Sequence, residues 1–495
     1  MRIGIVSTWF ERGAAYVSRQ YMQLLSRKHK VFIYARGGEI YGKGDPEWDK
    51  PFVTWGTCVN RRSTDIDIDN FTNWIKNNKI DVIFFNEQTY YEPIICARNL
   101  GVKVGAYIDY YKKDTISCFA IYDFIICNTK RHYSVFKDFN QCYYVPWGTD
   151  IELFKPQSKS SEQFIFFMSV GYAPRRKGAD VAIKALGMID EKYDCQLIIH
   201  SQVDLASALP ECRDLINTLT IKKRLKIICK TETAPGLYHL GDVYIYPSWL
   251  DGIGLSLTEA VACGVPVITT NTPPMNEIGE EDFVEYIDVD KYIAREDGYY
   301  WPLSIVNVIS LRDKMLKFLK CNTIDILKEN ARKYAEKELD WNKNENIVNE
   351  IFENSIILDV SNEIIKEARK LDNKGLNSAY KYIQIANNVK RINDKLKTIS
   401  GNLAIYGNGE HTKMLFELTE IGKYDIQFII DKNHWINENY NVIDVNSIND
   451  FKIDNIIISS YKWQKDMISK LVDDLKYSGN IICIYDESDN GEFYL

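Results

Sequence analysis

The fold is decided by the segment DGIGLSLTEAVACGVPVITT, residues 251–270. Gly252 and Gly254 form a turn, small residues at helical spacing follow, and the apolar run VPVIT closes the segment. A glycine turn that opens a helix and leads into a buried strand is typical of a parallel α/β sheet. We therefore expect a helix that begins near Leu255 and lies between two parallel strands.

Two carboxylates stand eight positions apart in this segment: Asp251 precedes the turn and Glu259 lies inside the helix. The N-terminus of a helix presents free backbone N–H groups and a partial positive charge, which hold a diphosphate without requiring a metal ion. Asp251 can accept hydrogen bonds from a sugar ring, and Glu259 from the vicinal hydroxyls of a ribose. The pattern predicts a nucleotide-sugar site, and the alternative is an ordinary turn with solvated acids.

Length and composition narrow the class of protein. With 495 residues the chain is too long for one core, so we expect two or three domains. The 45% hydrophobic content supports full cores, and a formal net charge of -7 disfavours a nucleic-acid partner. The eleven cysteines contain no CxxC pair and the six histidines are dispersed. We therefore expect neither a zinc site nor a disulfide framework, and a reducing cytoplasmic location.

The first residues, MRIGIVSTWF, have the pattern of a buried strand and lack the apolar region and cleavage site of a signal peptide. Nothing in the sequence has membrane-spanning length. These features predict a soluble protein and leave a peripheral contact with the inner face of a membrane open. The abundance of Lys, Asn, Ile and Tyr points weakly to a bacterial source.

Short apolar runs alternate with helical patterns along most of the chain, which predicts parallel strands linked by crossover helices. A polar break near Lys155 separates two such series, a segment rich in helix formers follows Leu358, and a third series begins at Asn402. The predicted domains are an N-terminal Rossmann-like domain, a donor domain with closing helices, a helical connector and an accessory Rossmann-like domain, over residues 1–157, 158–356, 357–399 and 400–495.

The loop in VGYAPRRKGADVAIKAL, residues 170–186, places three consecutive cations between a strand and a helix. Arg175, Arg176 and Lys177 can neutralise anionic oxygens there. Taken alone, the same residues also fit a solvated basic loop.

Over residues 1 to about 350 the sequence resembles the group 1 glycosyltransferases, which are retaining enzymes of the GT-B fold. The family's two acidic residues, with seven residues between them, fall on Asp251 and Glu259, with Asp251 in place of the more usual Glu. The family loop G-R-x-x-x-x-K-G falls on Gly171 to Gly178, so Lys177 matches its phosphate-binding lysine. Tyr172 stands at the arginine position, and Arg176, or else Arg175, supplies the missing cation.

The resemblance extends to the N-terminal domain. The loop ERGAAYVSR matches the family's glycine loop, which brings Gly13 and Ala14 to the donor phosphate or the acceptor. The segment VPWGTDIELFKP is similar to V-P-N-G-V-D-x-x-x-F-x-P. In YIDYY, Asp109 keeps the acid of the family's His-Asp pair and is the acceptor-side candidate, although a structural role fits it equally well.

The resemblance implies a GT-B fold, with two doubly wound Rossmann-like domains that face a cleft. It implies a retaining, metal-independent glycosyltransferase that moves a sugar from a nucleotide-diphosphate sugar to a glycan, lipid-linked or protein acceptor in glycan biosynthesis. No cofactor and no metal ion are expected. The catalytic candidates are Asp251, Lys177, Arg176 and Asp109, and the substrate-binding candidates are Glu259, Gly13, Ala14, Gly252, Gly254, Leu255, Arg175 and Tyr172.

Two alternatives to this function stay open. One is a phosphorylase or epimerase that acts on a nucleotide sugar with the same fold. The other is a catalytically weak, transferase-like scaffold protein whose last domain recruits partners within a glycosylation assembly.

In that last domain, the motif GNGEHT satisfies the first part of a dinucleotide fingerprint at Gly407 and Gly409, and Asp431 follows at the end of the next strand. Thr412 replaces the third glycine. We expect a docking role, with a membrane or protein partner, in preference to a second enzyme.

Overall fold

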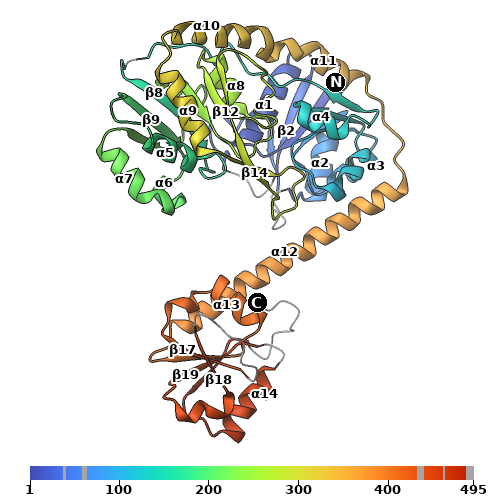
Figure 1. Ribbon diagram of the computed structural model, residues 1–495. Helices are drawn as coiled ribbons and strands as arrows, with labels where there is room; N and C mark the ends of the chain where they lie inside the picture. The colour runs from blue at the N-terminus through green and yellow to red at the C-terminus, as the bar shows by residue number, and fades with distance from the viewer. Residues whose placement is uncertain (37–40, 58–63, 160, 432–439, 461–462, 486–495) are drawn as a thin grey trace. The chain divides into compact units, whose positions relative to one another are not determined.

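The computed structural model describes residues 1–36, 41–57, 64–159, 161–431, 440–460 and 463–485 (Figure 1). The chain divides into two compact units, residues 1–372 and 373–495. Over the described residues, no helix combines the length and the apolar character needed to cross a membrane.

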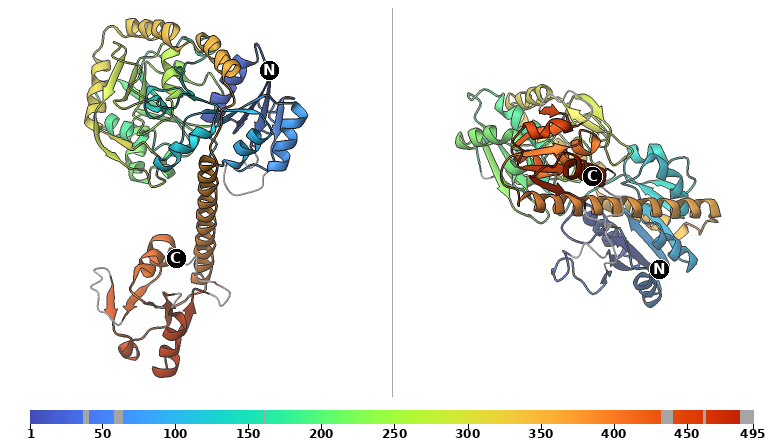
Figure 2. Two further views of the ribbon diagram at one scale, coloured as in Figure 1. Left: turned by 90° about the vertical axis from the view of Figure 1, so that its right-hand side faces the viewer. Right: turned by 90° about the horizontal axis from the view of Figure 1, so that it is seen from below.

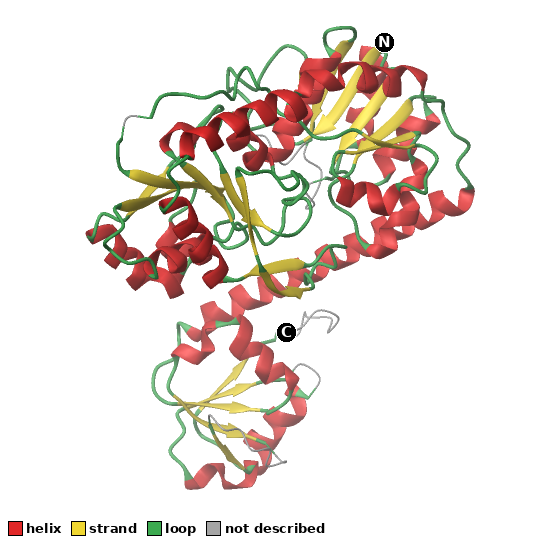
Figure 3. Cartoon of the chain, turned by 45° about the horizontal axis from the view of Figure 1, so that its top comes forward, coloured by secondary structure: helices red, strands yellow, loops and turns green. Residues whose placement is uncertain are grey.

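The first unit begins with a parallel seven-stranded sheet of order β3-β2-β1-β4-β5-β6-β7. The order turns back at β1, which creates a crevice at the carboxyl ends of β1 and β4. Helices cover both faces of the sheet, as in Figure 3. The elements are β1 (Arg2–Ser7), α1 (Gly13–Leu25), β2 (Lys30–Ala35), β3 (Val53–Trp55), α2 (Ile68–Asn78), β4 (Val82–Asn86), α3 (Glu92–Asn99), β5 (Lys103–Tyr107), β6 (Phe124–Cys127), α4 (Lys130–Phe136) and β7 (Cys142–Tyr144).

A second parallel sheet, of order β10-β9-β8-β11-β12-β13, follows in the same unit. After it, β14 and β15 form an antiparallel hairpin, and the last helices of the unit follow. The elements are β8 (Phe164–Gly171), α5 (Ala179–Gly187), β9 (Cys195–Ser201), α6 (Leu205–Ala208), α7 (Arg213–Ile221), β10 (Leu225–Cys229), β11 (Val243–Tyr246), α8 (Leu255–Ala262), β12 (Val267–Thr270), β13 (Val284–Ile287), β14 (Val289–Ile293), β15 (Leu303–Val306), α9 (Val308–Leu319), α10 (Ile324–Tyr334) and α11 (Glu345–Asn354).

The end of this series returns to the first sheet. Trp341 is buried, and its ring packs against Tyr21 and Trp147 at centroid distances of 5.0 and 4.9 Å. The Trp341 amide donates to the Thr149 carbonyl, and the indole Nε1 donates to the Gln20 carbonyl. This packing of Trp341 joins the two sheets of the first unit, which helps to fix the cleft between them.

Helix α12 (Asn362–Leu396) is continuous and begins in the first unit and ends in the second (Figure 2). Its bounds fall within the predicted helical segment 357–399. Lys and Glu at helical spacing are strong helix formers, which explains why the sequence indicated a helix there.

The second unit contains a five-stranded parallel sheet of order β18-β17-β16-β19-β20. The Asp431 carboxylate accepts a hydrogen bond from the Asn408 backbone N–H at 2.8 Å, and the Thr412 hydroxyl donates to the Gly407 carbonyl at 2.7 Å. Asp431 and Thr412 thus hold the glycine turn in place. The elements are β16 (Leu403–Tyr406), α13 (Glu410–Leu418), β17 (Ile426–Ile430), β18 (Asn441–Ile443), β19 (Asn455–Ile458), α14 (Gln464–Ser469) and β20 (Asn480–Cys483).

The strands predicted from long apolar runs are present. For example, β1 and β8 form as expected, and α1 buries the predicted residues Val17, Tyr21 and Leu24. The sequence did not indicate the short edge strands β3, β7, β13, β18 and β20 or the β14–β15 hairpin. Only three to five residues make up each of these strands, so each carries little of the alternating pattern that identifies a strand.

Candidate functional site

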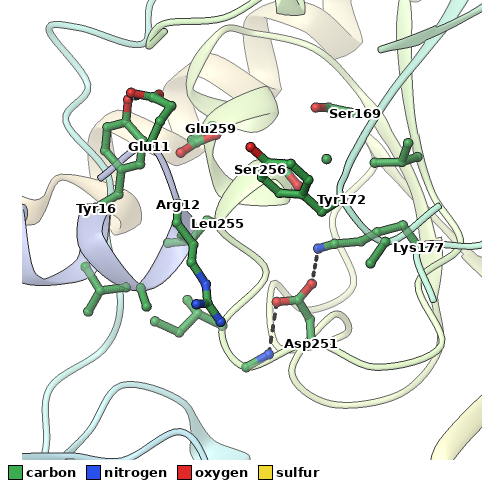
Figure 4. A pocket seen from close by; sticks show the side chains of 18 of the residues that line it. Glu11, Arg12, Tyr16, Ser169, Tyr172, Lys177, Asp251, Leu255, Ser256 and Glu259 are labelled. Atoms are coloured by element: carbon green, nitrogen blue, oxygen red, sulfur yellow. Dashed lines mark hydrogen bonds and ion pairs between the residues drawn. The ribbon is translucent and has the colours of Figure 1, made fainter. Parts of the chain in front are cut away.

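A cavity of about 1050 Å³ lies between the carboxyl ends of the two sheets of the first unit. It is the expected place for a ligand, because parallel sheets bind ligands at the ends of their strands. Ten of the predicted site residues line it: Gly13, Ala14, Asp109, Tyr172, Arg176, Lys177, Asp251, Gly252, Leu255 and Glu259. Figure 4 shows Glu11 and Arg12 on one side of the cavity and Lys177 and Asp251 on the other.

The turn after β11 forms as predicted and opens α8 at Leu255. Gly254 has a φ of 86°, a left-handed conformation that glycine adopts without the strain a side chain would bring. Gly254 itself does not line the cavity, whereas Leu255 and Ser256 in the first turn of α8 do. Because amides in the first turn of a helix have no intrahelical acceptor, this wall of the cavity carries hydrogen-bond donors and a partial positive charge.

Asp251 is the centre of a hydrogen-bonded network on the second-domain wall. Its Oδ2 accepts from the Lys177 ammonium and the Tyr246 hydroxyl, and the Lys177 Nζ also donates to the Tyr246 hydroxyl at 2.6 Å. Its Oδ1 accepts from the Gly252 amide at 2.9 Å and the Gly254 amide at 3.4 Å. In this structure, therefore, Asp251 holds Lys177 and the glycine turn.

Burial and charge act in opposite directions on this network. Burial favours a neutral Asp251, but the Lys177 and Arg176 cations outweigh it and hold the pKa of Asp251 well below its usual range. Burial lowers the pKa of Lys177, and the attraction of Asp251 opposes that shift. The result is an anion that fixes the position of a cation beside the helix N-terminus.

Glu259 lies one helical turn further along α8 and has a different environment. The Tyr238 hydroxyl donates to its Oε2. Burial raises the pKa of Glu259 to about 7, although the Tyr238 hydrogen bond and the Lys177 charge both lower it. Glu259 is thus a carboxyl that exchanges its proton near neutral pH, partly exposed to the cavity.

The two arginines of the cationic loop between β8 and α5 point in different directions. Arg176 lines the cavity, and its Nη1 lies 3.7 Å from the Asp251 Oδ2. Arg175 does not line the cavity, because its guanidinium is paired with Glu211 at 2.8 Å. Tyr172, with 61% of its surface exposed, projects into the cavity in Figure 4. The placement favours Arg176, not Arg175, as the cation next to Lys177.

The cationic loop ends at Gly178, where only glycine fits. Its φ is 75°, and a Cβ atom there would lie 2.2 Å from the Pro247 carbonyl oxygen. Any larger residue would push the loop away from the strand that carries Tyr246, and with it Lys177.

On the first-domain side, Asp109 follows β5 and faces the glycine turn directly. A Cβ atom on Gly252 would lie 2.0 Å from the Asp109 Oδ1, so only glycine fits there without a shift of this carboxyl. Burial and the neighbouring Glu87 carboxylate raise the pKa of Asp109 well above its usual range. Gly13 and Ala14 begin α1 on the same side, and the Ala14 carbonyl accepts from the Asn86 side chain at 2.8 Å.

Three polar residues near the domain boundary, Asn128, His132 and Glu277, have structural partners. The Asn128 side chain accepts from the Tyr21 hydroxyl at 2.9 Å, and His132, fully buried, contacts the Tyr111 hydroxyl at 3.0 Å. Glu277 belongs to the second sheet's domain, yet its carboxylate accepts from the Lys130 and Arg131 amides at 2.7 and 2.8 Å. Glu277 therefore caps α4 of the opposite domain.

The β14–β15 hairpin also connects the two sides of the cleft. The Tyr299 hydroxyl donates to the Asp109 carbonyl at 2.9 Å, and the Tyr300 amide donates to the Tyr111 carbonyl at 3.0 Å. The Trp301 Nε1 donates to the Tyr111 hydroxyl at 2.6 Å. Tyr299 and Arg295 of this connection line the cavity.

The structure also brings to the site residues that the sequence did not indicate, among them Glu87, Tyr246, Arg295 and Tyr299. Glu87 and Tyr246 stand at the carboxyl ends of apolar strands, where a polar side chain is a readable signal in a parallel sheet. Arg295 and Tyr299 had no such signal, since they depend on a hairpin whose short strands the pattern did not indicate.

Comparison with known proteins agrees with this geometry. Residues 150–338 match the family model described as glycosyl transferases group 1. A curated relative, an uncharacterized glycosyltransferase of Methanocaldococcus jannaschii, is 27% identical over 144 residues, which are 27% of this chain and 36% of that protein. The chain thus spans about a third of the length of this relative.

Solved structures show the same architecture. Sucrose-phosphate synthase from Thermosynechococcus elongatus superposes with a TM-score of 0.57 at 15% identity, over 72% of this chain and 98% of that one. An Anabaena protein solved in complex with UDP and glucose gives 0.55 at 14% identity, over 71% and 98%. The predicted GT-B fold is confirmed, together with an additional C-terminal parallel-sheet domain.

Proposed function

We propose that this chain, whose residues 150–338 match the group 1 glycosyl transferases, transfers a sugar from a nucleotide-diphosphate sugar to an acceptor hydroxyl. The observation that carries the proposal is the convergence of Lys177, Arg176 and the N-terminus of α8 on one wall of the cavity. Two cations and a helix N-terminus at one place suit a diphosphate.

In the proposed complex, the diphosphate lies against the first turn of α8, with its oxygens near Lys177 and Arg176. As the bond between the sugar and the diphosphate breaks, negative charge grows on the leaving phosphate, and these fixed donors stabilise it. We propose that they do so without a metal ion. Glu259 takes the ribose hydroxyls of the nucleotide, since it is a partly exposed carboxyl on the same helix.

The acceptor enters against the first domain, where Asp109 orients it. We propose that the acceptor hydroxyl attacks from the face that the diphosphate leaves, so that the anomeric configuration is retained, and that its proton passes to a donor phosphate oxygen. The Asp251 carboxylate fixes Lys177 through a direct ion pair and lies beside the Gly252 turn, where hydroxyls of the transferred sugar approach. A role in surface-polysaccharide or protein glycosylation at the cytoplasmic side of a membrane is part of the proposal.

Binding of a nucleotide sugar is tested most directly by a thermal-shift panel of UDP-, GDP- and ADP-sugars. A ligand that binds only the folded protein raises the melting temperature by mass action, by an amount equivalent to about 2.7 kcal/mol at a hundredfold excess over its Kd. We expect one nucleotide class to stabilise the first unit and to be hydrolysed slowly without an acceptor. A panel with no stabilising member would refute the proposal, and binding without any hydrolysis or transfer would favour the scaffold alternative.

The two loop arginines provide a matched pair of variants. We expect Arg176→Ala to lower kcat/KM by about a hundredfold, because a charged donor to the leaving phosphate is lost. Arg175→Ala should stay within about twofold of the unmodified protein, since its guanidinium is paired with Glu211 outside the cavity. Steady-state kinetics with the donor found by the panel measures both, and equal losses in the two variants would contradict the assignment.

A further inference from the structure

Two carboxyl groups lie side by side on the first-domain wall of the cavity, outside the cationic wall described above. Glu87 follows β4 and Asp109 follows β5, and these neighbouring strands pair in register, with Asn86 opposite Tyr107. The Glu87 carboxyl adds to the burial that raises the pKa of Asp109, and both side chains line the cavity. The pair therefore presents carboxyl oxygens to whatever occupies this side.

The backbone of Glu87 is held in an uncommon conformation. Its φ is 52°, in the left-handed region, which costs a residue with a side chain about 1 kcal/mol or more. Arg36, only 2% exposed, donates from Nη1 to the carbonyls of Asn86 and Glu87, both at 3.0 Å. The Arg36 hydrogen bonds thus hold the strained Glu87 backbone in place. This backbone conformation brings the Glu87 side chain to the cavity.

Aromatic rings complete this wall. Tyr110 and Tyr299 stack with a centroid distance of 5.2 Å and an interplanar angle of 12°, and both line the cavity. An aromatic face packs against the C–H face of a sugar ring, while carboxyl oxygens accept hydrogen bonds from its hydroxyls. The combination of a stacked aromatic pair and a carboxyl pair suits a polyhydroxylated ring.

The charged residues of this wall indicate whether the acceptor ring is neutral or carries an anionic group. Asp109 faces the negative charges of Glu87 and Asp251, and Arg131 is the cation that acts on it. Arg12 and Arg295 also line the cavity, and the Arg295 guanidinium is paired with Asp297 at 3.0 and 2.6 Å. A phosphate on the acceptor next to its attacking hydroxyl would approach the Glu87 carboxylate and be repelled.

We propose that Glu87 and Asp109, with the Tyr110–Tyr299 stack, form an acceptor subsite for a neutral polyhydroxylated ring, and that Glu87 selects against a phosphate group beside the attacking hydroxyl. This inference rests on the proposed transferase function and names the substrate class of its acceptor side. Glu87 accepts a hydrogen bond from an acceptor hydroxyl next to the one that attacks. It takes no part in binding the donor, whose contacts lie on the opposite wall.

The acceptor class is tested with matched probes and the donor identified by the thermal-shift panel. The probes are methyl glycosides of glucose, mannose and N-acetylglucosamine with their 6-phosphates, and myo-inositol with inositol 1-phosphate. We expect transfer to a neutral member with a kcat/KM at least about tenfold above that of its phosphorylated partner. Preference for the phosphorylated member of a pair, or no transfer to any neutral probe, would overturn the proposal.

Variants of Glu87 separate acceptor binding from a structural role. Glu87→Gln should raise the KM for the neutral acceptor by about tenfold and leave the donor Kd within about twofold. Glu87→Lys should move the preference toward the phosphorylated partner. Glu92→Gln, a carboxylate paired with Arg369 outside the cavity, is the matched control and should change neither constant.

The outcomes also distinguish this inference from the proposed function. A Glu87→Gln variant whose donor Kd rises as much as its acceptor KM has lost structure, not an acceptor contact, and overturns the inference. A protein that binds no nucleotide sugar refutes the proposed function instead. If the donor binds and is transferred, but Glu87→Gln leaves the acceptor KM unchanged, only the acceptor subsite is wrong.

Discussion

Lys177→Ala is expected to lower kcat by about a thousandfold, the upper end of the effect of removing one preorganised donor from a developing anion. Lys177 is largely buried, is oriented by Asp251 and Tyr246, and lies beside the N-terminus of α8. Its charge is therefore fixed before the reaction begins. Single-turnover rates with saturating donor measure the loss, because they report departure of the diphosphate without the contribution of product release.

Lys177→Ala also removes the cation that pairs with the buried Asp251 carboxylate, and this loss lowers the stability of the folded protein. The variant must therefore be compared at a temperature at which circular dichroism shows it to be folded. Lys184→Ala is the matched control, since Lys184 lies on the adjacent helix α5 and pairs with Asp180, away from the cavity. An unchanged single-turnover rate in folded Lys177→Ala would show that the leaving group is stabilised by other residues.

Glu259→Gln is expected to have opposite effects on ligand binding and on stability. If Glu259 accepts two hydrogen bonds from the ribose, loss of its charge should raise the donor Kd by about a hundredfold, because hydrogen bonds to a charged group contribute about 1.5–3 kcal/mol each. The ligand-free protein should become more stable. Calorimetric titration measures the first effect and chemical denaturation the second.

The stability effect follows from the direction of the pKa shift. The pKa of Glu259 is raised from 4.5 to about 7 in the folded protein, so the folded state holds the proton more tightly than the unfolded chain does. The ionised carboxyl then destabilises the fold, starting as the pH rises above 4.5 and fully above 7. At pH 8 the Gln variant should be more stable by about 3 kcal/mol, and near pH 4.5 the difference should vanish.

Donor affinity should show the corresponding pH dependence. In the unmodified protein the Kd should rise as the pH falls below about 7, since protonation removes the acceptor charge of Glu259. In Glu259→Gln the Kd should stay constant between pH 5.5 and 8. Glu232→Gln is a useful comparison, because Glu232 lines the same cavity but is paired with Lys230 and has a pKa below its usual range. A pH dependence that survives in Glu259→Gln would assign it to another group.

Much of the fold could be predicted from the sequence, because the patterns that identify its strands and helix starts lie within short, continuous segments. Runs such as FIFFMSVG or DVIFF contain enough consecutive apolar residues to identify a buried parallel strand, and the glycine turn after Asp251 marks a helix start. The β14–β15 hairpin could not be predicted in this way. Its residues Val289–Ile293 are mostly exposed and alternate weakly, and the hairpin is stabilised by contacts with Tyr110 and Tyr111, far away in the sequence.

The candidate site shows the same division. Asp251, Lys177 and Glu259 lie in short motifs, so the sequence placed them together, and the structure brings them to one wall of the cavity. The sequence could not separate Arg175 from Arg176, because neighbouring residues share a loop while their directions depend on partners such as Glu211. Nor could it show that Asp251 is engaged by Tyr246, which requires the register of β11 against the loop.

The Glu277 carboxylate, which accepts hydrogen bonds from the Lys130 and Arg131 amides, ties the two halves of the cleft together. Such a bond is directional and short-ranged, so a small rotation of one half against the other breaks it at once, unlike a sliding apolar contact. Together with the Tyr299 and Tyr300 hydrogen bonds across the cleft, this contact resists rotation of the two halves of the first unit.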